Sequence, residues 1–185
     1  MLRFLALTLS LGTLVTSPAI AQDGNSQDKS LDVRSSVGDL HVGPDADAKK
    51  VGLPLYPGAH PKHEEDNNPL NFGILTESFG MTLVVAKYES NDPPAKVLDF
   101  YREKMKKYGK VVECRGDSDH HDSEDEGQGG SKPVKCEGDN TGPVRELKVG
   151  TEDNARVVAI ENPDSPKGTI FALVYVHTRG KRGEI

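Results

Sequence analysis

The chain has 185 residues, of which 23 are Lys or Arg and 29 are Asp or Glu, giving a formal net charge of -6 at pH 7. This acidic balance argues against a nucleic acid as partner, because binding to phosphates depends on basic surface. A hydrophobic share of 35% in a chain of this length predicts one folded core rather than two.

Residues 1–21 have the pattern of a secretory signal peptide. Arg3 supplies a positive start, residues 4–15 carry no charge, and Ala19 and Ala21 are small residues at the positions that signal peptidase reads. We therefore expect cleavage before Gln22 and a periplasmic or secreted protein. The mature chain has no apolar stretch near the roughly 20 residues of a transmembrane helix, so no transmembrane segment is expected in it.

Residues 22–50 are expected to form a flexible N-terminal arm, with at most one short edge strand around residues 37–42. This segment has too few apolar side chains to offset the entropy of ordering the chain. The folded domain is expected over residues 51–178, followed by a basic tail at 179–185. Near its start, Pro57-Gly58 suits the two central positions of a type II turn.

Apolar runs at residues 72–76 and 81–88 predict an antiparallel hairpin. Further strands are expected at 111–114, 133–136, 144–149, 155–160 and 169–177, with 133–136 pairing with 111–114. Short connections between the later strands favour an antiparallel meander. The runs 81–88 and 169–176 are apolar at both alternating sets of positions, which predicts interior strands with at least part of both faces covered.

One helix is predicted between these strands. Asp92 is a good N-cap, Pro93 suits the first helical position and Gly109 suits the end. The apolar positions recur every three or four residues at Val97, Phe100, Tyr101, Met105 and Tyr108. The predicted fold class is therefore α+β, an antiparallel sheet of about five to seven strands with one main helix packed on one face.

Cys114 and Cys136 are the only cysteines, and an even number in an exported chain predicts a disulfide. The bond would close the acidic loop at 115–133 and contribute roughly 3 kcal/mol by the chain-entropy relation. Two separately buried thiols or a redox pair are the alternatives, although no Cys-x-x-Cys spacing supports the second.

The acidic loop also contains the densest group of potential metal ligands, and carboxylates and imidazoles suit divalent cations. The candidates are Asp117, Asp119, His120, His121, Asp122 and Glu124. The spacing does not match an EF-hand, since Asp122 occupies the sixth position instead of glycine and Gln128 the twelfth instead of glutamate. We favour a solvated loop and keep a divalent-metal-binding protein as the alternative function. Beyond a weakly bound divalent metal, no cofactor is predicted.

No motif points to catalysis. A hydrolase would require His177 or His60 to meet an acid from another element, and no serine or cysteine motif supports either. We expect no catalytic or cofactor-binding residues, and interpret the chain as a non-enzymatic binding or interaction module of the cell envelope. Its partner would be an envelope protein or a small ligand. An apolar patch above a few hundred Å² on the sheet face that the single helix leaves uncovered would mark the partner site.

Two segments also carry a resemblance to known proteins. They are GLPLYPGA at residues 52–59 and KYESNDPPAKVLDFYREKMKKYG at residues 87–109. Together with the apolar run at 171–176, they resemble a group of small uncharacterised bacterial exported proteins, over roughly residues 33–180. The resemblance implies export and a compact α+β domain, and it brings no catalytic or binding residues.

Overall fold

The computed structural model describes residues 30–62, 69–116, 131–136 and 140–180. The strands are β1 (Leu31–Ser35), β2 (Gly38–Gly43), β3 (His60–Pro61), β4 (Leu70–Leu75), β5 (Gly80–Ser90), β6 (Val112–Arg115), β7 (Val144–Thr151), β8 (Asn154–Ile160) and β9 (Thr169–Arg179). The helices are α1 (Ala48–Val51), α2 (Pro94–Met105) and the 3₁₀ turn η1 (Lys106–Tyr108). The predicted signal peptide lies outside the described residues.

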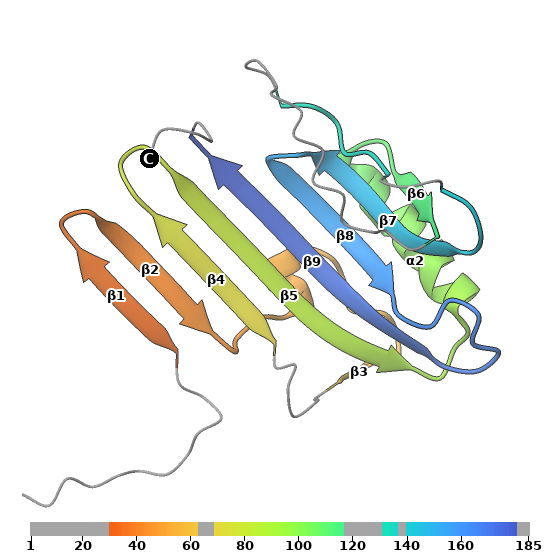
Figure 1. Cartoon of the computed structure of the whole chain (residues 1–185). Helices are drawn as coiled ribbons and strands as arrows, with labels where there is room; N and C mark the ends of the chain where they lie inside the picture. Colours follow the sequence, from red (N-terminus) through yellow and green to blue (C-terminus); the bar gives the residue numbers. More distant parts are fainter. Residues whose placement is uncertain (1–29, 63–68, 117–130, 137–139, 181–185) are drawn as a thin grey trace, which may run out of the picture.

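All the strands belong to one antiparallel sheet in the order β1-β2-β4-β5-β9-β8-β7-β6, and β3 pairs with the end of β5 (Figure 1). The α+β architecture with one main helix is confirmed. The expected five to seven strands are wrong, because the described residues alone form a sheet of nine. Two of the additional strands, β1 and β2, lie within residues 22–50, where we expected an arm with at most one strand. These two strands are ordered because β1 pairs with β2, and β2 pairs with β4, along their lengths.

The predicted pairing of 133–136 with 111–114 is also wrong. Strand β6 pairs with β7, and Pro133 makes an isolated bridge to Thr151 at the other end of β7. Proline has no N–H to donate, so this segment cannot build a regular ladder. Instead, the Val134 N–H donates to the Gly150 carbonyl at 3.2 Å, extending the β7 edge beyond β6.

Helix α2 begins one residue later than predicted, with Pro94 at its first position and Pro93 as the N-cap. Pro93 offers no capping side chain, and the carboxylate of Asp92 instead accepts from the Tyr56 hydroxyl at 2.8 Å and from Lys96 at 2.9 Å. Gly109 does not form the left-handed cap that we expected there, because its ψ is -160°, although its φ of 132° favours glycine. The helix tightens into η1, which ends at Tyr108, directly before Gly109. The predicted end of the helix is therefore confirmed.

The core lies between the sheet and the helices. Tyr101 of α2 is fully buried, and its ring centroid lies 5.7 Å from that of Phe171 in β9, which in turn stacks on Tyr88 of β5. The segment before β3 closes the core, with a turn at 56–59 in which Gly58 has a φ of 75° and the Ala59 N–H donates to the Tyr56 carbonyl at 3.0 Å. This confirms the predicted turn.

Candidate functional site

The central strands β5 and β9 show that the sheet has two unlike faces. Val84, Ala86 and Tyr88 of β5 are buried, as are their partners Phe171 and Leu173 on β9. The helices α1 and α2 pack on this side, against β5, β9, β8 and β7, and we call it the covered face (Figure 1). Successive side chains of a strand point to opposite faces, so the alternate positions form a second face.

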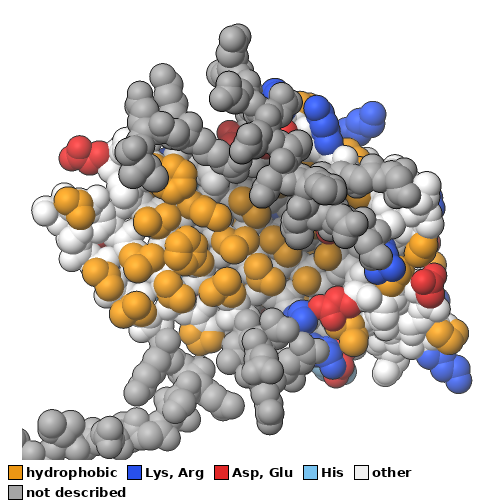
Figure 2. Space-filling view, viewed as in Figure 1, with side chains coloured by type: hydrophobic (Ala, Val, Ile, Leu, Met, Phe, Trp, Pro, Cys, Tyr) orange, Lys and Arg blue, Asp and Glu red, His pale blue; other side chains and the backbone are white. Residues whose placement is uncertain are grey.

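The second face is apolar across six neighbouring strands, and we call these side chains the open face (Figure 2). Its members share one side of the sheet by register. They are Leu31 and Val33 of β1; Leu40 and Val42 of β2; Leu70, Phe72 and Ile74 of β4; Met81, Leu83 and Val85 of β5; Ile170, Ala172, Val174 and Val176 of β9; and Ala155, Val157 and Ala159 of β8.

Among the described residues, no helix packs on the open face, because α1 and α2 both lie behind the sheet in Figure 1. Leu31 is 55% exposed and Val33 45%, and most of the remaining members are partly exposed. The 17 members each occupy roughly 33 Å² of the sheet, because strands lie about 4.8 Å apart and side chains on the same face of a strand lie about 6.8 Å apart, and together they make a footprint of about 600 Å². This is the upper end of the range for the largest apolar patch on a typical monomer.

Charged groups border the open face and are paired with one another. Lys87 lies 2.7 Å from Glu161, Lys148 lies 2.9 Å from Glu146, and Lys62 lies 3.5 Å from Glu89. Each pair joins opposite charges, so these three pairs of described residues add no net charge to the border. The middle of the open face carries hydrophobic side chains (Figure 2).

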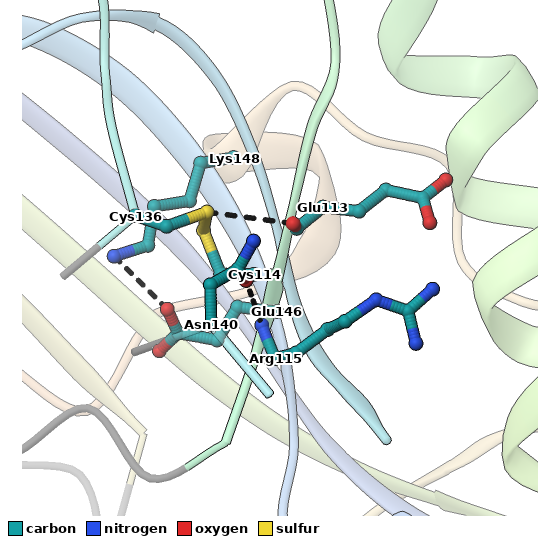
Figure 3. Close-up of a disulfide and its surroundings, with 7 residues drawn as sticks. All are labelled: Glu113, Cys114, Arg115, Cys136, Asn140, Glu146 and Lys148. Carbon is teal, nitrogen blue, oxygen red and sulfur yellow. Dashed lines mark hydrogen bonds and ion pairs between the residues drawn. A yellow bond between two sulfur atoms is a disulfide. The ribbon is translucent and has the colours of Figure 1, made fainter. Parts of the chain in front are cut away.

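The predicted disulfide bounds this side of the sheet at β6. Cys114 and Cys136 are bonded, with their Cα atoms 5.2 Å apart (Figure 3). Cys114 pairs with Glu146 of β7, and Glu146 pairs with Ala159 of β8, which is a member of the open face. Cys114 and Glu146 therefore lie on the same side of the sheet as the open face. The Arg115 N–H donates to Asn140 Oδ1 at 2.7 Å, which holds the returning chain against β6. The disulfide prediction is therefore confirmed.

Three hollows in the described part of the chain lie on the covered face or at the ends of the sheet. The first, about 660 Å³, lies between α1 and the end of α2 and is lined by Leu55, Lys104 and Lys107. The second, about 380 Å³, lies where β4 ends, β5 begins and β9 ends, and it is lined by Arg34, Asp39, His41, His177 and Arg179, among others. The third, about 340 Å³, lies beside His60 and Glu89.

The two histidines considered for catalysis lie on two different strands, β9 and β3. The His177 ring stacks on Tyr175 with centroids 6.3 Å apart, and its buried Nδ1 has no hydrogen-bond partner among the described residues. No nucleophile or orienting acid therefore bonds through that nitrogen. His60 lies in β3, exposed and opposite Glu89.

The six candidate metal ligands, Asp117, Asp119, His120, His121, Asp122 and Glu124, also lie outside the described residues, so the metal site stays a prediction. Within residues 30–62, 69–116, 131–136 and 140–180, no group of three or more His, Cys, Asp or Glu side chains is arranged to hold a metal ion.

The sequence reasoning missed the part of the open face that β1 and β2 supply. Leu31 and Val33, then Leu40 and Val42, alternate with polar residues on either side of a two-residue turn. This period-two pattern is typical of a half-buried hairpin and was the available signal. We expected a flexible arm instead, because the composition of residues 22–50 is mostly polar.

No helix in the described part of the chain combines the length and apolar character that crossing a bilayer requires. No protein-family model, no curated protein and no solved structure matches the chain. The resemblance to small exported proteins therefore stays a prediction, and the open face is the feature from which a function is inferred.

Proposed function

We propose that this protein is an exported, non-enzymatic binding module of the cell envelope that binds another polypeptide through its open face. The observation that carries the proposal is the apolar footprint of about 600 Å² on a sheet face that no described helix covers. Leaving such a surface in water costs free energy, because apolar area is stabilised by burial at about 25 cal/mol per Å².

A polypeptide fits this surface better than a small ligand does. Small-molecule sites are concave and enclose most of the ligand, with a few polar groups to orient it. The three hollows described above lie on the covered face or at the ends of the sheet rather than at the centre of the open face. A broad apolar sheet face matches the buried centre of a protein interface, where charged residues are depleted.

The test uses a photo-cross-linking amino acid in the protein in its own cells. Leu83 is the position of choice, because it lies in the middle of β5 between Phe72 of β4 and Val176 of β9. The matched control is Leu55, an exposed leucine (44%) that lines the hollow beside α1 on the covered face. We expect the probe at position 83 to form a covalent adduct with a polypeptide after irradiation, and the probe at position 55 to form much less.

Adduct formation at position 83 that does not exceed the level at position 55 would refute the proposal. The mass of the adduct separates the possible partners, since a second copy of this chain doubles the mass and a different polypeptide adds its own. Either mass supports a polypeptide-binding open face.

A further inference from the structure

We infer that the polypeptide on the open face is a second copy of this chain, packed face to face across a twofold axis into a two-sheet sandwich. The inference rests on the proposed function and names its partner. It follows from the charge, the size and the shape of the open face.

The charge argument concerns what a twofold axis brings together. In a twofold interface the same patch of both copies is in contact, so an unpaired charge near the axis would face the same charge of the other copy and be repelled by it. The centre of the open face is apolar, and the charged groups at its border are paired within one copy, as in Lys87–Glu161 and Glu146–Lys148. Among the described residues, the centre of the face can therefore meet its copy without like-charge repulsion, although each chain has a net charge of -6.

The size argument compares the buried area with what a stable dimer needs. Two footprints of about 600 Å² bury about 1,200 Å² in total, which reaches the standard range of about 1,200 to 2,000 Å². Interfaces between identical chains are also the more apolar class, as this face is. A single face left in solution would expose the same area with nothing to offset it.

The shape argument is that sheets commonly bury apolar faces against other sheets. Two sheets pack about 10 Å apart with interdigitating side chains and strand directions within about 30°. The open face is rich in Val, Leu and Ile on regular strands, and its central strands β5 and β9 are the longest in the sheet. A twofold axis near Leu83 and Val174 would place β5 and β9 of one copy over those of the other.

The experiment is sedimentation equilibrium of the mature full-length chain from about 1 to about 100 μM, a range that resolves micromolar affinity. We expect the wild type to be a dimer. The variant Leu83→Glu places a carboxylate in both halves of the interface and should raise the dissociation constant about 100-fold or more. The matched control Leu55→Glu makes the same chemical change on the covered side and should leave the dimer intact.

Circular dichroism and thermal melts must show that each variant is folded. If Leu83→Glu fails to fold, Val174→Thr replaces it, because this change keeps the shape of the side chain while burying a hydroxyl, and it should weaken the dimer about tenfold. A wild type that is monomeric at the highest concentration would overturn the inference. A dimer as stable in the folded open-face variant as in the wild type would also overturn it.

The two proposals fail separately. A monomeric wild type whose Leu83 probe cross-links a polypeptide of different mass removes the second copy and leaves the proposed function standing. A monomeric wild type with no adduct at position 83 removes both.

Discussion

At the scale of single residues, burial differs sharply between positions that point to the same face. Leu173 and Leu75 both lie on the covered face by register, yet Leu173 is fully buried under the helices and Leu75 is 43% exposed near the end of β4. The covered face is therefore a core only where α1, α2 and the 46–59 segment reach it.

This difference predicts the outcome of a matched pair of substitutions. Leu173→Ala should lower the free energy of unfolding by about 2 to 5 kcal/mol, because it removes buried methyl groups and leaves a cavity. Leu75→Ala should change it by less than about 1 kcal/mol. Urea unfolding of both variants measures the difference. Equal effects would contradict the conclusion that the covered face is a core only where α1, α2 and the 46–59 segment reach it.

His41 of β2 predicts a pH dependence at the level of one side chain. Its Nδ1 lies 2.7 Å from the Asp32 carboxylate across the β1–β2 pair, and this hydrogen bond, supported by Asp45, raises the pKa of His41 above its ordinary value of 6.5. The raised pKa means that the protonated form is favoured by folding. Its contribution to stability is complete below pH 6.5 and is lost as the pH rises through the folded-state pKa.

A proton NMR titration of the His41 ring tests this prediction. Asp32→Asn should lower the pKa of His41, because the strongest acceptor of the charged ring is removed. Asp39→Asn, on the same side of β2 and without a bond to His41, serves as the control and should leave that pKa where it is in the wild type. A His41 pKa that does not respond to Asp32→Asn would contradict the role assigned to this hydrogen bond.

At the scale of elements, local sequence patterns predicted the position of α2 well and the pairing of strands less well. The repeat of Val97, Tyr101 and Met105 predicts a helix with one buried face, and all three are buried against the sheet. The helix begins one residue later than predicted, and the Asp92 carboxylate, which we expected to cap it, instead accepts a hydrogen bond from Tyr56, a residue far away in the sequence. The partner of β6 was wrongly predicted, since pairing depends on which distant strand edge is free.

The disulfide links two elements that the sequence separates by 22 positions. Replacing both Cys114 and Cys136 by Ala should lower the free energy of unfolding by roughly 3 kcal/mol, because the unfolded chain regains the entropy of an open loop. Denaturant unfolding of the double variant measures the loss, and the wild type under reducing conditions should show a comparable decrease. A loss below about 1 kcal/mol in both would show that the link does not restrain the unfolded chain.

At the scale of the whole molecule, the decisive property is that one layer of helices covers one face of a wide sheet. The runs 81–88 and 169–176 predicted interior strands, and β5 and β9 do lie in the interior of the sheet. We expected at least part of both faces of these strands to be covered. Among the described residues, helices cover only one of them. The apolar alternation on the other face supports our proposal that this surface is buried by association rather than by folding.

The sequence by itself determined the α+β class, the disulfide pair, the single main helix and the apolar character of both sides of the central strands. These follow from local periodicity and composition, which report whether a side chain avoids water. Only the tertiary structure decided the nine-strand order, the extension of the sheet through β1 and β2, and which apolar side the helices cover. The physical reason is that a valine facing a helix of its own chain and a valine facing a partner satisfy the same hydrophobic requirement, so the pattern of residues is the same for both.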